Sequence, residues 1–189
     1  MSNTTVIFIH GFNSNPSDSF KPWLKEELEK QGVIVKMPQM PEADAPKLPI
    51  WLKVIDELIR MSDGKIILAG HSLGGTAILR YLEQQPPRPI AAAVLVAAVA
   101  TNAPGHPPAI SNFLKDPWQF DQIRAHCPNL FAIHSQDDTA VPFSDSKLLE
   151  ASLPLKLTTV NGYGHFSRRE NVTKVPELLK LLVEIINSE

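Results

Sequence analysis

Residues 65–82 read KIILAGHSLGGTAILRYL, and this stretch decides the fold. Its opening, residues 65–69, is a short and mostly apolar run that predicts a buried β-strand, and its end predicts a helix. Between them, Gly70, Ser72 and Gly74 form the pattern G-x-S-x-G. In this pattern a tight turn joins strand to helix, and glycines beside the serine let the two elements approach closely. The turn strains the backbone at Ser72 and presents its hydroxyl clear of the sheet.

Short apolar runs alternate with helical patterns along the rest of the chain, which predicts β-α units and a parallel sheet. Strands are predicted at residues 5–9, 33–37, 65–69, 92–97, 130–134 and 156–160. The hydrophobicity of these runs is continuous rather than alternating, so we expect helices to cover both faces of each strand. Helices are predicted at residues 20–31, 48–61, 73–84, 143–152 and 175–187. The expected fold class is α/β, a three-layer α/β/α sandwich around a mostly parallel sheet of about six strands.

One stretch, residues 101–120, lacks clear periodicity and is rich in proline. It falls between the fourth and fifth predicted strands, so we expect it to lie over the carboxyl edge of the sheet as a loop or small cap. The chain shows no linker, repeat or low-complexity segment. Its length of 189 residues suits one core, and a single domain over residues 1–189 is expected.

Composition narrows the classes of function. The 18 basic and 20 acidic residues are dispersed, and the only basic cluster is Arg168-Arg169, which argues against binding to nucleic acid or an anionic membrane. The longest apolar run, residues 90–100, is too short to span a bilayer. The single cysteine, Cys127, and the lack of an export signal favour the cytoplasm. No metal-binding or phosphate-binding motif is present, so no metal and no cofactor are expected, and no protein partner is indicated.

A serine nucleophile needs a base to take its proton and an acid to orient that base. In this kind of sheet the order along the chain is serine, aspartate or glutamate, then histidine. His165 lies in a glycine-flanked loop after the last predicted strand and is predicted to be the base for Ser72. Asp137 and Asp138 follow the fifth strand and point in different directions, so only one can meet His165. We choose Asp138, because residues 138–142 form a D-x-x-V-P run that resembles the one following the acid in many α/β-hydrolases, and Asp137 stays the alternative.

The other histidines have weaker claims to a chemical role. His10 ends the first predicted strand and is expected to shape the following loop. His71 occupies the variable position of the turn and is expected to point away from the nucleophile. His106, in the proline-rich stretch, could touch substrate, although an exposed loop residue is the simpler interpretation. His126 and His134 lie at the fifth strand and its approach, and no chemical role is predicted for them.

The oxyanion hole should consist of two backbone N–H groups, those of Leu73 and Phe12. Leu73 directly follows the nucleophile, and Phe12 lies in the loop after the first strand. Aromatic and apolar residues near these loops are candidates for binding the substrate. They are His10, Trp118, Val141, Phe143 and Phe166.

With these motifs in place, the chain resembles an α/β-hydrolase. More narrowly, it is similar to the small, minimally capped serine hydrolases of the retinoblastoma-binding-protein-nine and YdeN type. The residues that carry this resemblance are the turn around Ser72, the Asp138 loop, Asp116-Pro117-Trp118 and Gly164-His165-Phe166. The resemblance implies an α/β-hydrolase fold that lacks the first strands and a large cap.

The expected function is hydrolysis of small acyl esters through an acyl-enzyme, as in a carboxylesterase. Peptidase and thioesterase activities use the same machinery and stay as alternatives, so the substrate is a small ester or amide. A binding protein that keeps the fold without turnover is the remaining alternative.

Overall fold

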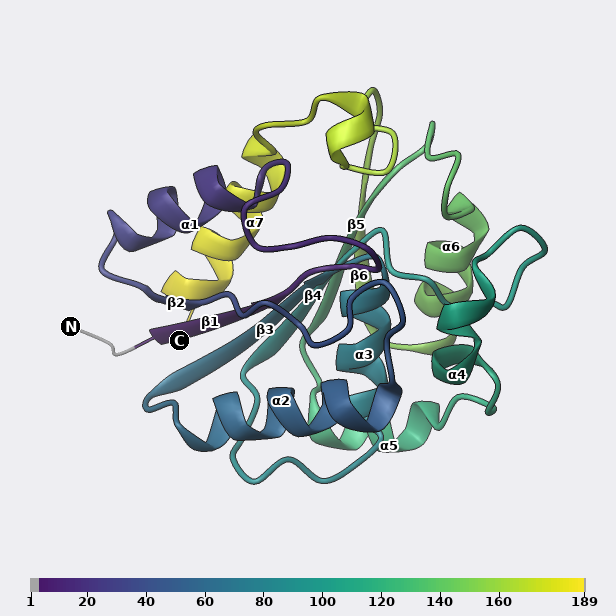
Figure 1. Cartoon of the computed structure of the whole chain (residues 1–189). Helices are drawn as coiled ribbons and strands as arrows, with labels where there is room; N and C mark the ends of the chain where they lie inside the picture. Colours follow the sequence, from purple (N-terminus) through teal and green to yellow (C-terminus); the bar gives the residue numbers. More distant parts are fainter. Residues whose placement is uncertain (1–3, 189) are drawn as a thin grey trace.

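A six-stranded sheet runs through the middle of the molecule (Figure 1). The computed structural model describes residues 4–188. The strands are β1 (Thr4–Ile9), β2 (Ile34–Lys36), β3 (Lys65–His71), β4 (Ala92–Val96), β5 (Leu130–Ser135) and β6 (Leu155–Val160). Every neighbouring pair is parallel, in the order β2-β1-β3-β4-β5-β6. The predicted α/β class and strand number are confirmed.

Helices cover the sheet on both sides and complete the three layers (Figure 1). They are α1 (Lys21–Glu29), α2 (Leu48–Arg60), α3 (Leu73–Leu82), α4 (Ser111–Leu114), α5 (Phe120–His126), α6 (Phe143–Ser152) and α7 (Pro176–Asn187), with 3₁₀ turns η1 (Pro108–Ile110) and η2 (Arg168–Glu170). Side chains of α1 and α7 pack on one face, and those of α2, α3 and α6 pack on the other. Within the described residues, no helix combines the length and the apolar character needed to cross a membrane.

Alternate residues of a central strand serve two separate cores. In β3, Ile66 and Leu68 belong to the core under α2 and α3, whereas Ile67 and Ala69 belong to the core under α1 and α7. This explains the continuous hydrophobicity of the run. The expectation of cover on both faces is wrong for the edge strands, because β2 and β6 are partly open and Ile34 is 46% exposed. A helix layer covers the middle of a twisted sheet better than its edges.

The strand order places the site. The chain moves outward from β1 to β2, then crosses back past β1 to β3. The loops that leave the carboxyl ends of β1 and β3 therefore diverge, and a crevice forms between them, as at other points where the strand order reverses. Ser72 begins the turn after β3, and Phe12 lies in the loop after β1.

The proline-rich stretch is more regular than predicted, because η1, α4 and the start of α5 lie within it. These helical turns are held by contacts from elsewhere in the chain. Arg80 is buried and donates hydrogen bonds to the carbonyl groups of Phe113 (2.8 Å), Asp116 (2.6 Å) and Pro117 (3.3 Å). Asp145, also buried, accepts from the backbone N–H of Ala100 at 2.7 Å, where the stretch begins. Such short helices have no strong periodicity of their own.

Candidate active site

The turn around Ser72 has the geometry that its glycines predict. Ser72 has φ 54° and ψ −123°, a conformation that is strained for a residue with a side chain. A Cβ on Gly70 would lie 2.6 Å from the backbone of Gly74. A Cβ on Gly74 would lie 2.1 Å from the carbonyl oxygen of Ile9. Strand and helix can therefore approach each other, and β1 can approach both, only with glycine at these positions.

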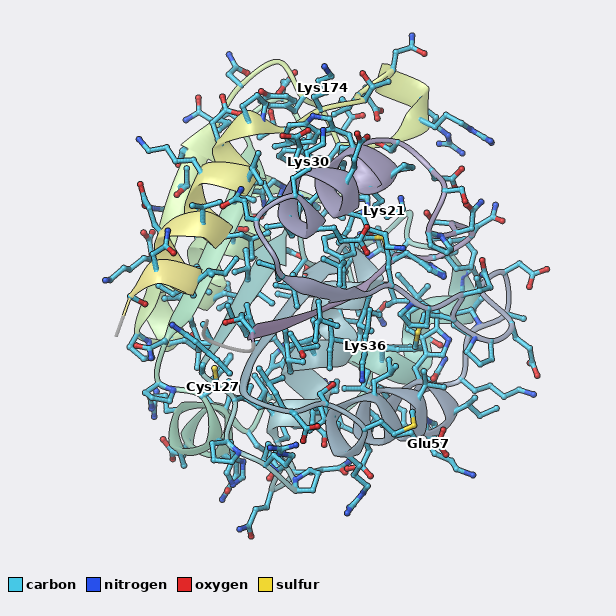
Figure 2. The ribbon with its side chains drawn as sticks, turned by 90° about the vertical axis from the view of Figure 1, so that its left-hand side faces the viewer. Lys21, Lys30, Lys36, Glu57, Cys127 and Lys174 are labelled. Carbon is cyan, nitrogen blue, oxygen red and sulfur yellow. The ribbon has the colours of Figure 1, made fainter. Side chains whose placement is uncertain are left out.

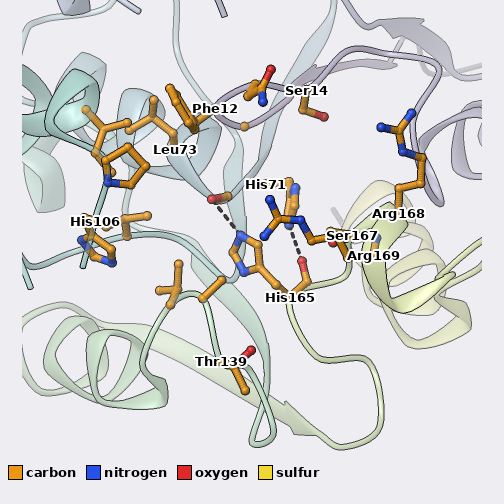
Figure 3. A pocket seen from close by; sticks show the side chains of 18 of the residues that line it. Phe12, Ser14, His71, Leu73, His106, Thr139, His165, Ser167, Arg168 and Arg169 are labelled. Atoms are coloured by element: carbon orange, nitrogen blue, oxygen red, sulfur yellow. Dashed lines mark hydrogen bonds between the residues drawn. The ribbon is translucent and has the colours of Figure 1, made fainter. Parts of the chain in front are cut away.

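The structure brings together the three side chains that the sequence singled out. Ser72 Oγ lies 3.0 Å from His165 Nε2 (Figure 3), and on the other side of the ring His165 Nδ1 lies 2.8 Å from Asp138 Oδ2. These distances let the hydroxyl donate to the imidazole and the imidazole donate to the carboxylate. The Asp138 side chain is fully buried, and that of His165 is 14% exposed. The imidazole is thus open to the cavity at its Ser72 side and held at the other.

Hydrogen bonds to both carboxylate oxygens of Asp138 keep this side chain ionised. Its Oδ1 accepts from the backbone N–H groups of Ala140 (2.8 Å) and Val141 (2.9 Å). Burial alone would raise the pKa of this carboxyl, but hydrogen bonds from His134 and His165 outweigh burial and hold the pKa well below its ordinary value. A carboxylate that stays ionised can stabilise a cationic imidazole beside it.

Asp137 faces away from His165 and ties two loops together. Its Oδ1 accepts from the hydroxyl of Ser135 and from the backbone N–H of Gly162 at 3.0 Å. Asp137 is exposed, and the hydrogen bond from Ser135 lowers its pKa. This aspartate therefore connects the loop after β5 to the loop after β6, which is a structural role.

His134 is a site residue that sequence reasoning missed. Its Nε2 lies 3.1 Å from Asp138 Oδ2, the same oxygen that meets His165, and 3.2 Å from the carbonyl oxygen of Val141. Because both neighbours are acceptors, Nε2 carries the proton, and Nδ1 accepts from Ser146 Oγ at 2.7 Å. His134 is fully buried. Its place one residue before the end of β5, on the strand that leads to Asp138, is the only sequence signal of this contact.

Two further histidines shape the loops around the nucleophile. His71 donates from Nε2 to the carbonyl oxygen of His165 at 2.8 Å and thereby holds the loop that carries the base. Burial, with the neighbouring charges of His165 and Lys21, holds the pKa of His71 well below its ordinary value. His10 accepts from the backbone N–H of Met40 at 2.9 Å, so it fixes the loop after β1 as expected. Burial lowers the pKa of His10.

The two N–H groups expected to form the oxyanion hole both border the cavity. Phe12 and Leu73 line it, and neither backbone N–H donates to another group of the described residues. Leu73 is the first residue of α3, where N–H groups have no partner inside the helix. A Cβ on Gly11 would lie 3.5 Å from Ser72 Oγ, which shows how closely the loop after β1 approaches the nucleophile.

A cavity of about 670 Å³ opens over Ser72, His165 and Leu73 (Figure 3). Val141 lines it, as predicted. The other four substrate-binding candidates do not, and each has a packing role instead. His10 fixes its loop, and Trp118 stacks under Arg80 with its Nε1 donating to the Ala100 carbonyl at 2.8 Å.

Phe143 and Phe166, two of the predicted substrate-binding residues, also lie outside the cavity lining. Phe143 packs its ring against His134 with centroids 5.5 Å apart. Phe166 is fully buried in the core under α1 and α7, stacked on Tyr163. Bulky aromatic residues next to catalytic loops commonly serve to fix those loops, and the sequence cannot separate that use from contact with substrate.

Of the remaining residues His106, His126 and Cys127, only the first lines the cavity. Neither of the ring nitrogens of His106 has a hydrogen-bond partner among the described residues. His126 hydrogen-bonds the carbonyl of Leu82 from Nδ1 at 2.8 Å and lies away from the cavity. Cys127 is buried, and burial raises the pKa of its thiol to about 12, so it is a packing residue. Among residues 4–188, no cluster of His, Cys, Asp and Glu is suited to hold a metal ion.

The strained turn after β3, the order of serine, aspartate and histidine along the chain, and the parallel sheet define the α/β-hydrolase class. A family model described as serine hydrolase matches residues 6–184. The chain therefore belongs to the serine hydrolase family, within the group that includes YdeN and RBBP9, and the predicted resemblance is confirmed.

Two relatives and one other fold neighbour illustrate the match. YdeN of Bacillus subtilis (strain 168) is 30% identical over 185 residues, which cover 97% of each chain. The serine hydrolase RBBP9 of Rattus norvegicus is 29% identical over 149 residues, 78% of each chain. The crystal structure of the ydeN product superposes with a TM-score of 0.92 at 29% identity, covering 98% of this chain and 100% of that one. Est1E from Butyrivibrio proteoclasticus shares the fold, with a TM-score of 0.75 at 19% identity, covering 99% of this chain and 90% of its own.

Proposed function

We propose that the protein is a carboxylesterase that cleaves small acyl esters through an acyl-enzyme. In this proposal Ser72 is the nucleophile, His165 the base and Asp138 the acid. The observation that supports it most is the unbroken pair of hydrogen bonds, 3.0 Å from Ser72 to His165 and 2.8 Å from His165 to Asp138. Membership of the serine hydrolase family supports the same chemistry.

The reaction follows from these positions. Ser72 Oγ attacks the acyl carbon while its proton passes to His165 Nε2, and the ionised Asp138 stabilises the imidazolium. The N–H groups of Phe12 and Leu73 donate to the oxygen that becomes negative. The carbon–oxygen bond to the alcohol then breaks, and the alcohol leaves with the proton from His165. A water molecule attacks the acyl-enzyme, its proton passes through His165 back to Ser72, and the acid is released.

Labelling by a fluorophosphonate probe tests this chemistry directly. The purified wild-type protein should label at Ser72, and Ser72→Ala should not label and should lose on the order of 10⁶-fold in kcat on an aryl acetate. Ser167→Ala is the matched control, because Ser167 also lines the cavity but contacts Glu170 rather than His165. A folded wild-type protein that neither labels nor turns over esters would instead support the alternative of a non-catalytic binding protein.

The preference among esters, thioesters and amides is measured with substrates that share one acyl group. We expect kcat/KM to be highest for oxygen esters when ester, thioester and aminoacyl amide substrates share one acyl group. A series of chromogenic esters from acetyl to octanoyl then measures the acyl length that the cavity accepts. Faster turnover of the amide or thioester would reassign the protein as a peptidase or thioesterase with the same machinery. We further propose the cytoplasm as its compartment, since its one cysteine cannot form an internal disulfide.

A further inference from the structure

The cavity holds a buried lysine that the proposed mechanism does not use. Lys21 is the first residue of α1 (labelled in Figure 2), is only 1% exposed, and lines the cavity. Its Nζ donates to Ser14 Oγ at 3.3 Å, and it forms no ion pair with a carboxylate of the described residues. Burial lowers the pKa of this amine to about 8, so most of the lysine is still charged at pH 7. Lysines are almost never fully buried unless an anion pairs with them.

The surroundings of Lys21 hold two further cations and two carboxylates, and neither carboxylate pairs with Lys21 directly. Arg168 and Arg169 line the same cavity from η2 (Figure 3). The first carboxylate, that of Asp18, accepts from the backbone N–H of Asn15 at 3.2 Å and meets Arg168 at 3.7 Å. It reaches Lys21 only through the Ser14 hydroxyl, which donates to Asp18 at 3.3 Å and accepts from Lys21.

The second carboxylate, that of Glu170, accepts from the backbone N–H and hydroxyl of Ser167 within its own turn. This end of the cavity therefore carries three cationic side chains, and neither of its two carboxylates forms a direct ion pair with Lys21.

The opposite end of the cavity differs in chemistry. It is apolar, with Phe12, Leu73, Val99, Ile110 and Val141 in its lining. Figure 3 shows Phe12 and Leu73 on one side of His165, and Ser14, Arg168 and Arg169 on the other. A substrate that reacts at Ser72 thus has an apolar part on one side and meets positive charge on the other.

We propose that the substrates of this site carry a carboxylate, which Lys21 binds at the cavity end that it shares with Arg168 and Arg169. The proposal rests on the hydrolase function and names a class of substrate for it: esters with a free carboxylate on the acyl part or on the leaving alcohol. The carboxylate supplies the direct ion pair that Lys21 lacks among the described residues, and a charge-assisted hydrogen bond in a buried site favours it over a neutral group of the same shape.

The test uses pairs of esters that differ only in this charge. In the first pair, the para-nitrophenyl monoester of adipic acid is compared with the same compound bearing a carboxamide, so the charge lies on the acyl part. In the second pair, para-acetoxybenzoate is compared with para-acetoxybenzamide, so the charge lies on the leaving group. At pH 7, kcat/KM for the carboxylate should exceed that for the carboxamide by roughly tenfold in at least one pair.

Variants assign that preference to the lysine. Lys21→Met should bring the ratio close to one, whereas Lys25→Met, on the exposed side of the same helix, should keep the wild-type ratio. Arg169→Gln, at the exposed rim, should reduce it by a smaller factor. Lys21→Met should also unfold at a higher temperature than wild type, because it removes a buried charge that makes no direct ion pair. A ratio at or below one in both wild-type pairs, or an unchanged ratio in Lys21→Met, overturns the proposal.

Binding measurements separate this proposal from the hydrolase function. If no ester is turned over and no probe labels Ser72, the hydrolase proposal fails. Calorimetry with the inactive Ser72→Ala protein still compares the carboxylate with the carboxamide of each pair. Tighter binding of the carboxylate that disappears in Ser72→Ala/Lys21→Met upholds the anion site, and equal binding refutes it.

Discussion

The nucleophile turn and the acid loop meet at His165, yet they depend on different kinds of contact. At the turn the requirement is steric, because a side chain at Gly70 or Gly74 would overlap neighbouring backbone atoms. In the acid loop the requirement is for hydrogen bonds, because backbone N–H groups and two imidazoles hold Asp138 in place. A steric requirement excludes most residue types and can therefore be recognised in the sequence. A hydrogen bond can be made by many residue types, so it is harder to recognise there.

Of the changes that separate the two regions, removing the charge of the acid loop should have the largest effect. Asp138→Asn should lower kcat by about 10⁴-fold, because an amide neither holds the active tautomer of His165 nor stabilises its cation. Asp137→Asn should lower kcat less than about tenfold, since that carboxylate bonds Ser135 and Gly162 rather than His165. Steady-state kinetics on one aryl ester measures both. A reversed order of the two effects would move the acid to Asp137.

The same contrast explains what the sequence could predict. The turn, the sheet and the central strands follow from glycine positions and continuous apolar runs, and these were predicted to within a few residues. The choice of Asp138 over Asp137 depended on a motif. The contact of His134 with Asp138 joins residues four apart at a strand end, and no residue pattern distinguishes it from ordinary packing.

The cavity lining was the least predictable part. Trp118 and Phe166 look like pocket residues in the sequence, but Arg80 and Tyr163 occupy their faces. Lys21 belongs to an amphipathic helix whose other lysine, Lys25, is exposed, so the burial of Lys21 follows only from the way α1 meets the loop after β1. Burial of single side chains is set by tertiary packing, which local patterns do not encode.

A second prediction tests the steric side of the comparison. Gly74→Ala should lower the free energy of unfolding by more than about 3 kcal/mol, because its Cβ would lie 2.1 Å from the Ile9 carbonyl oxygen. Gly32→Ala is the matched control: it is strained at φ 77° but meets nothing within 4 Å, and should cost about 1 kcal/mol. Urea denaturation measures both. Equal losses would mean that the turn tolerates a side chain and that its glycines serve backbone conformation alone.

A third prediction addresses the second histidine of the acid loop. The double variant His134→Phe/Ser146→Ala removes the donor to Asp138 without leaving a buried hydroxyl unpaired. We expect kcat to fall roughly tenfold with KM unchanged, because the carboxylate loses one of the groups that orient it toward His165. Ser146→Ala alone is the control, and His134→Gln, which keeps a donor, should recover part of the activity. Wild-type kcat in the double variant would limit His134 to packing.

The smallest expected effect is on the free energy of unfolding at acid pH, which depends on the acid loop and not on the glycine substitutions. The pKa of Asp138 is lower in the folded protein than its unfolded value of about 3.9, so its ionised form stabilises the fold above that pH. This contribution is lost as the pH falls below about 4, when protons bind the unfolded chain first. The free energy of unfolding should therefore drop less between pH 5 and pH 3 in Asp138→Asn than in wild type, while Gly32→Ala keeps the wild-type drop. Urea titrations at each pH give these slopes, and parallel slopes in all three proteins would show that Asp138 is not held as an anion by its loop.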